Sequence, residues 1–156
     1  MRLFITLPVV FAAAILSVPS TVQAVDAMKS DSVVKIETNV GKLDADGKQV
    51  VTLTFNIDKG WHLYANPVPK DFPGVPVEVT VIGKTKPASV KVEYPTGKEV
   101  KDATIGDYKV YEEKAEVKIL VQRAKGDTDP LELAVKLQAC TDKKCLLPAT
   151  VKLSVQ

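Results

Sequence analysis

The sequence contains few of the residues that most metal and hydrolase sites require. Its 156 residues include two cysteines, one histidine and two methionines, one of which is Met1. A structural zinc site takes four nitrogen or sulfur ligands, so this set is too small for one and also argues against a copper or zinc carrier. No Gly-x-Ser-x-Gly motif occurs and the single histidine has no partnered nucleophile, which gives a serine hydrolase little support. We expect neither a metal site nor another cofactor.

An excess of charge of either sign is also absent. Lys and Arg number 21 against 19 Asp and Glu, and the charges are scattered along the chain. A block of basic residues would favour a nucleic acid or an anionic membrane as partner, and no such block occurs. We therefore expect no nucleic-acid partner and no membrane partner for the mature chain.

Long apolar runs are missing except at the beginning of the chain. Residues 1–24 consist of one basic residue, a short apolar run, and small residues that include Val22 and Ala24 at the positions a signal peptidase reads. This layout predicts a cleaved secretory signal peptide. An uncleaved membrane anchor is the alternative.

Cleavage after Ala24 leaves 132 residues, which is enough for one domain with a hydrophobic core. We expect residues 25–31 to be a flexible lead-in and 32–156 to be the domain. The mature protein is expected to be soluble and exported, and periplasmic if its source is bacterial.

The rest of the chain alternates apolar with polar residues. No segment keeps helical spacing, whereas period-two alternation is typical of strands with one buried and one exposed face. The alternating segments are residues 32–38, 49–57, 75–82, 88–94, 114–122, 131–139 and 148–155. Segments rich in Gly, Pro and Asp separate them, as turns do. Seven or eight such strands predict an all-β fold, an immunoglobulin-like antiparallel β-sandwich.

The two cysteines, Cys140 and Cys145, lie between the last two of these segments. Their intervening residues, "TDKK", are predicted to form the tip of a hairpin at one end of the sandwich. A disulfide across so short a loop stabilises the fold by only about 2 kcal/mol, which makes it a weak structural bridge. Lys143 and Lys144 would favour a reactive thiolate, although exposed lysines are often only solvated charge. The residues alone leave a redox-active and a structural disulfide open.

A second group of chemically distinctive residues is the segment "GWHLYANP". Alternation puts His62 and Tyr64 on one face of a strand, and Trp61 and Leu63 on the other. We expect the second pair to belong to the core and the first pair to be candidates for a site. The alternative is an ordinary surface histidine beside an aromatic at the edge of the core.

Together, "GWHLYANP", "YPTGKEVKDATIGDYKVYE" and "ACTDKKCLLP" resemble the N-terminal periplasmic domain of the thiol:disulfide interchange protein DsbD, the disulfide-bond-corrector domain family. The resemblance covers roughly residues 33–155. It implies an immunoglobulin-like sandwich and a protein-disulfide reductase type of activity. In this family, electrons come from a thioredoxin-like domain and pass to periplasmic disulfide-bearing proteins through a mixed disulfide.

The resemblance also implies roles for particular residues. Cys145 matches the cysteine of the mixed disulfide and Cys140 its resolving partner, while Tyr64 and His62 match positions near the active site. A cap loop that shields the cysteines matches Lys101, Asp102, Ala103, Thr104, Ile105 and Gly106.

This chain departs from the family pattern in three ways. Four residues separate its cysteines where the best-known member has five, and its cap carries Thr104 and Ile105 where that member has an aromatic. No transmembrane section and no Cys-x-x-Cys motif follow the domain, so we expect electron donor and acceptor to be separate proteins. The alternative function is a non-catalytic sandwich module with a permanent hairpin disulfide.

Overall fold

The structure is a computed structural model that describes residues 28–82 and 86–156. The expected signal peptide lies outside the described residues. A single 3₁₀ turn, η1 (Ser30–Ser32), precedes eleven strands in the described part of the chain. Every pairing between these strands is antiparallel.

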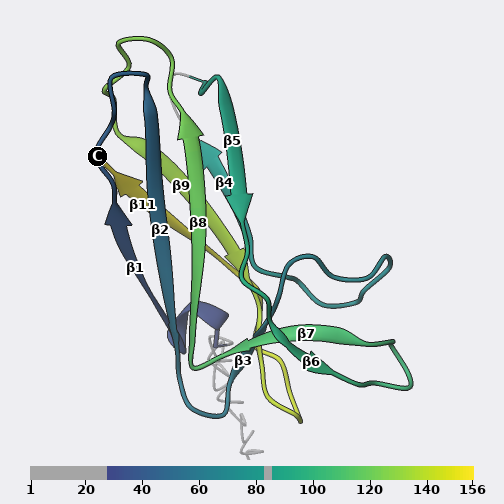
Figure 1. Cartoon of the computed structure of the whole chain (residues 1–156). Helices are drawn as coiled ribbons and strands as arrows, with labels where there is room; N and C mark the ends of the chain where they lie inside the picture. The colour runs from purple at the N-terminus through teal and green to yellow at the C-terminus, as the bar shows by residue number, and fades with distance from the viewer. Residues whose placement is uncertain (1–27, 83–85) are drawn as a thin grey trace, which may run out of the picture.

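Two of the three sheets form a sandwich. The larger sheet has the order β1-β2-β8-β5, with β1 (Val34–Val40), β2 (Lys48–Ile57), β8 (Lys114–Gln122) and β5 (Ser89–Glu93). The other has the order β11-β9-β4, with β11 (Ala149–Val155), β9 (Leu131–Leu137) and β4 (Glu78–Ile82). Figure 1 shows the two sheets as layers in the upper part of the molecule.

Alternation of side chains along the strands produces the core between these sheets. Every second residue of β8 and of β9 is buried, as expected for strands with one face turned inward. Each fully buried Val, Leu or Phe side chain contributes about 1.5–3 kcal/mol relative to exposure. The largest fully buried side chains on the strands of these two sheets are Phe55, Leu53, Ile119, Leu131, Leu133 and Leu137. The all-β, immunoglobulin-like antiparallel sandwich expected from the sequence is confirmed.

The third sheet lies at one end of the sandwich and is made of short strands. Its order is β10-β3-β7-β6, with β10 (Ala139–Cys140), β3 (His62–Tyr64), β7 (Tyr108–Glu112) and β6 (Lys98–Val100). In Figure 1 this sheet and the yellow hairpin that follows β9 occupy the lower part of the view. The seven alternating segments all appear as strands, and the strand expected around His62 and Tyr64 is β3. The sequence analysis did not predict the other three short strands, which have only two to five residues each.

The small sheet has an inner and an outer face. Leu63 pairs with Ala139 on one side and Tyr111 on the other, and all three are buried in the common core. His62, which alternates with Leu63, pairs with Cys140 on the opposite face. The sheet therefore joins the sandwich core by one face and presents the cysteine hairpin on the other.

The first described residues, 28–31, pack against the cysteine hairpin. Lys29 forms a parallel bridge with Leu147, and Ser30 is fully buried. The backbone N–H of Ser30 donates to the Leu147 carbonyl at 2.9 Å. Residues 28–31 therefore pack beside the cysteine hairpin because a small hydroxyl side chain fits between its two arms.

Candidate functional site

The two cysteines form a disulfide across a tight hairpin. Cys140 and Cys145 are directly opposed in an antiparallel bridge, with a Cα–Cα distance of 4.0 Å and an S–S distance of 2.01 Å. The Thr141 N–H donates to the Lys144 carbonyl at 2.8 Å, and the Leu146 N–H donates to the Ala139 carbonyl at 2.9 Å. These two backbone bonds lie on either side of the cysteine pair, so the expected hairpin with "TDKK" at its tip is present.

The two sulfur-bearing residues differ sharply in exposure. Cys140 is only 1% exposed, whereas Cys145 is exposed to solvent. Thiol–disulfide exchange requires access of the attacking thiolate to one particular sulfur. Solvent can therefore reach Cys145 but not Cys140.

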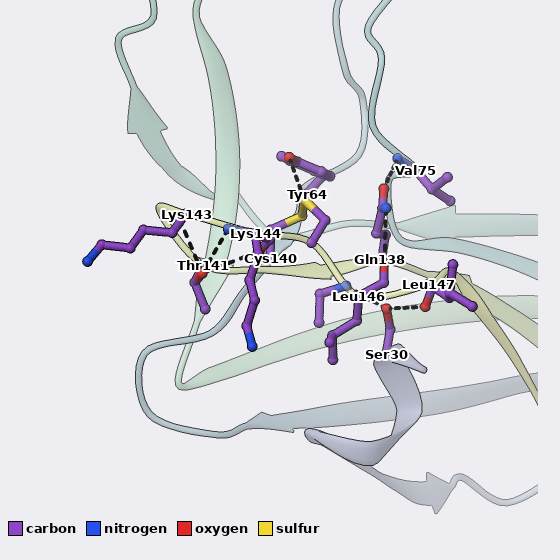
Figure 2. The surroundings of a disulfide bond; sticks show 12 residues. Ser30, Tyr64, Val75, Gln138, Cys140, Thr141, Lys143, Lys144, Leu146 and Leu147 are labelled. Atoms are coloured by element: carbon purple, nitrogen blue, oxygen red, sulfur yellow. Dashed lines mark hydrogen bonds between the residues drawn. A yellow bond between two sulfur atoms is a disulfide. The ribbon is translucent and has the colours of Figure 1, made fainter. Parts of the chain in front are cut away.

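Tyr64 contacts the exposed half of the disulfide. Its hydroxyl lies 3.7 Å from Cys145 Sγ, and Figure 2 shows this contact as a dashed line. A disulfide sulfur carries no proton, so the tyrosine is the donor. Burial raises the pKa of Tyr64 above its usual value, which keeps the hydroxyl protonated at neutral pH.

A cluster of aromatic rings surrounds Tyr64. The rings of Phe72 and Tyr108 lie 4.8 and 5.7 Å from it, both edge to face, and 5.3 Å from each other. Phe72 comes from the loop between β3 and β4. That loop approaches closely at Gly74, where an added Cβ would come within 2.4 Å of Tyr64 Cε2 and 2.7 Å of Phe72 Cε1. Only glycine leaves room for both rings here.

His62 lies at the start of β3, two residues before Tyr64 and directly opposite Cys140. It is half-buried, its ring meets that of Tyr64 at 5.9 Å, and the two share a face as expected. On the opposite face Leu63 is fully buried, and Trp61 is partly buried against the core. Burial lowers the pKa of His62, while the Asp142 and Glu112 carboxylates act against this shift.

The two lysines of the hairpin tip do not point to the sulfurs. Lys144 Nζ lies over the Trp61 ring, 5.8 Å from its centroid. In Figure 2 both the Lys143 and the Lys144 side chains extend away from the disulfide. Their expected effect on a thiolate stays a prediction.

The segment expected to cap the cysteines closes the β6–β7 hairpin. The Asp102 carboxylate accepts hydrogen bonds from the backbone N–H groups of Thr104 and Ile105, at 2.7 and 3.1 Å. Lys101, at its start, forms ion pairs with Glu99 and Asp107. Within the described residues, no hydrogen bond, ion pair or ring contact joins residues 101–106 to either cysteine. Shielding by this segment remains a prediction.

Two side chains that the sequence analysis did not identify hold the arms of the hairpin. The Ser30 hydroxyl donates to the Leu147 carbonyl at 2.7 Å and accepts from the Ala139 N–H at 2.9 Å. The Gln138 amide donates to the Leu146 carbonyl at 3.2 Å and accepts from the Val75 N–H at 3.1 Å. Figure 2 shows both sets of contacts beside the disulfide.

Four residues of this site were thus missed by sequence reasoning: Ser30, Phe72, Tyr108 and Gln138. Ser30, Phe72 and Tyr108 come from segments far from the cysteines in the sequence, whereas Gln138 is two residues before Cys140 but falls on the polar side of an alternating segment. The only local signal was the aromatic and proline content of the segments around Phe72 and Tyr108.

A family model described as the thiol:disulfide interchange protein DsbD, N-terminal, matches residues 24–156. This chain belongs to that family. The match spans the whole sandwich, the small sheet and both cysteines, which confirms the resemblance seen in the sequence.

Solved structures similar to this DsbD N-terminal family member share its fold at low identity. The reduced DsbD N-terminal domain of Neisseria meningitidis is 16% identical with a TM-score of 0.51, and covers 81% of this chain and 86% of that one. The N-terminal periplasmic domain of ScsB from Proteus mirabilis is 18% identical with a TM-score of 0.58, over 78% of this chain and 46% of that one. A complex of the DsbD and PilB N-terminal domains from Neisseria meningitidis is 17% identical with a TM-score of 0.53, over 83% and 87%. A comparison with curated proteins found no match.

Two further observations concern the described residues of this family member. Residues 28–82 and 86–156 contain no helix long and apolar enough to cross a membrane. Nor does this part of the chain hold a group of three or more His, Cys, Asp or Glu side chains placed to bind a metal ion.

Proposed function

We propose that this chain is an exported thiol–disulfide exchange domain that passes reducing equivalents to periplasmic protein disulfides through the Cys140–Cys145 pair. The observation that carries the proposal is the unequal exposure of the two cysteines, at a site that family membership associates with thiol–disulfide interchange. In the reduced chain the Cys145 thiolate attacks an acceptor disulfide, and one acceptor thiol leaves. Cys140 then attacks Cys145 Sγ, releases the second acceptor thiol and restores the disulfide.

We further propose that a separate thioredoxin-like protein reduces the pair again. Support comes from a related DsbD N-terminal domain that forms a complex with the N-terminal domain of another protein, PilB. The exposed Cys145 and the rings beside it would meet the partner first. In this proposal the hairpin over residues 101–106 gates access, and the donor, the acceptors and this chain meet in the periplasm.

Trapping of the mixed disulfide tests the proposal. The Cys140→Ala variant leaves Cys145 without its resolving partner, so it should accumulate a covalent adduct with the active-site cysteine of a thioredoxin-like domain. The matched Cys145→Ala variant keeps only the buried thiol and should form little adduct. Non-reducing electrophoresis with mass spectrometry measures both, and equal adducts from the two variants would contradict the assigned roles.

The alternative, a structural disulfide in a non-catalytic module, has one observation in its favour, the burial of Cys140. The reduction potential separates the two functions. A structural bridge should lie below about −300 mV, whereas exchange proteins lie between about −120 and −270 mV. A value in the lower range for the purified protein would favour the alternative.

A further inference from the structure

Each cysteine has its own polar neighbour on β3. Tyr64 contacts Cys145, and His62 is the direct cross-strand partner of Cys140. Side chains at directly opposed positions of antiparallel strands share a face, with Cβ atoms about 4.5–5.5 Å apart. The His62 ring therefore lies within reach of Cys140, on the strand that flanks this cysteine on the side opposite Cys145.

Cys140 presents a chemical difficulty that Cys145 does not. Only the thiolate attacks a disulfide, and an ordinary thiol with a pKa of about 8.5 is only a few per cent ionised at pH 7. Burial disfavours the charged form further. With an exposure of 1%, Cys140 cannot give its proton directly to bulk water. Its attack needs a proton acceptor inside the site.

The surroundings of His62 suit a neutral base. Burial lowers the pKa of the imidazole, so it is unprotonated at neutral pH and free to accept a proton. The Asp142 and Glu112 carboxylates then stabilise the imidazolium that forms, because an opposite charge nearby favours the charged form. Lys98, which pairs with Glu112, acts in the opposite direction. The titratable and charged groups around His62 are Tyr64 on β3, Cys140 and Asp142 on the hairpin, Glu112 and Glu113 at the end of β7, Lys98 on β6, and Asp58 and Lys59 before β3.

We propose that His62 accepts the proton of the Cys140 thiol as Cys140 resolves the mixed disulfide held by Cys145. The inference rests on the proposed function. The proton moves from sulfur to the imidazole, and the Cys140 thiolate attacks Cys145 Sγ. The bond between Cys145 and the acceptor breaks, the acceptor sulfur leaves as a thiolate, and the imidazolium returns its proton to that thiolate or to water.

A two-phase reaction with 5,5′-dithiobis(2-nitrobenzoate) tests this role. Fully reduced protein, mixed with one equivalent in a stopped-flow instrument, releases one coloured thiolate when Cys145 attacks and a second when Cys140 resolves the adduct. In the His62→Gln variant the second phase at pH 7 should be slower by about tenfold or more, in line with loss of a general base. The difference should shrink as the pH rises and the Cys140 thiol ionises unaided. The first phase should be nearly unchanged.

Two comparisons separate this role from a structural one. A proton acceptor speeds both directions equally, so the His62→Gln variant should keep the reduction potential of the wild type. Lys59→Gln, an exposed change in the pocket that His62 also lines, should leave both phases unaltered. An unchanged second phase in His62→Gln, or a loss that does not vary with pH, would overturn the inference while leaving the proposed function intact. A wild type that never releases the second thiolate would instead contradict the proposed function.

Discussion

Ser30 offers the sharpest test of how the cysteine hairpin is held. Its hydroxyl accepts the Ala139 N–H and donates to the Leu147 carbonyl, so it joins the arm before Cys140 to the arm after Cys145. In a regular antiparallel ladder the Ala139 N–H would donate to the Leu146 carbonyl. Here the Leu146 carbonyl accepts from the Gln138 amide, and the Ser30 hydroxyl accepts from the Ala139 N–H in its place. Replacing Ser30 with alanine removes this link and introduces no steric clash.

The expected loss of stability follows from the two partners. In the alanine variant the Leu147 carbonyl still accepts a hydrogen bond from the backbone N–H of residue 30, so this carbonyl keeps a partner. The Ala139 N–H is different: its residue is 0% exposed, and the Ser30 hydroxyl is its side-chain acceptor. An unsatisfied buried donor costs about 1–3 kcal/mol. At about 4 °C per kcal/mol for a domain of this size, the Tm should fall by about 4–12 °C.

Thermal unfolding of the oxidised protein, followed by circular dichroism, measures the effect. Ser32→Ala is the matched control, because Ser32 is exposed and its hydroxyl bonds only locally to the Lys29 carbonyl. A surface change of this kind should alter stability by less than about 0.5 kcal/mol. Equal Tm values for the two variants would refute the argument that Ser30 closes the hairpin.

Two further substitutions test the ring cluster beside Cys145. Gly74→Ala places a Cβ inside the contact distance of the Tyr64 and Phe72 rings, so the near-ultraviolet circular dichroism of the aromatic residues should change. An unaltered spectrum would show that the loop moves aside without disturbing the packing of these rings. Tyr64→Phe keeps the ring and removes the donor to Cys145, so the pKa of the reduced Cys145 thiol should rise, since a hydrogen bond to a thiolate favours the charged form. Thiolate absorbance as a function of pH measures this shift, and a pKa equal to that of the wild type would remove the hydroxyl from the site.

The sandwich could be read from the sequence because its strands are long and half-buried. In β9 the residues alternate over seven positions, and Leu131, Leu133, Val135 and Leu137 all lie inward as the pattern requires. The same reasoning placed Leu63 in the core and separated it from His62 and Tyr64. Where a strand has one buried and one solvent-exposed face, the hydrophobic effect selects apolar and polar residues in alternation, so the sequence predicts the strand.

The site could be read only in part, since its contacts join segments that periodicity does not connect. β10 has two residues and β6 has three, too few for an alternating pattern to stand out. Ser30 reaches Ala139 across a sequence separation of 109 residues, and no local feature marks it as buried. The cysteines and Tyr64 were found through their chemistry, whereas the residues that hold them were not.

Under the proposed function, the hairpin would let the disulfide exchange through the exposed Cys145 while Cys140 stays buried. The bond closes a loop so short that it accounts for only about 2 kcal/mol of stability, so its reduction removes little from the fold. The backbone bonds at Thr141 and Leu146 and the Ser30 link do not involve sulfur, and they keep the arms in register after the bond opens. The two thiols therefore stay opposed, with Cys145 exposed and Cys140 enclosed. A resolving Cys140 held in this position would attack the mixed disulfide at Cys145 faster than a thiol from a second partner could. A cysteine pair that joined distant strands through the core could not open in this way without unfolding part of the sandwich.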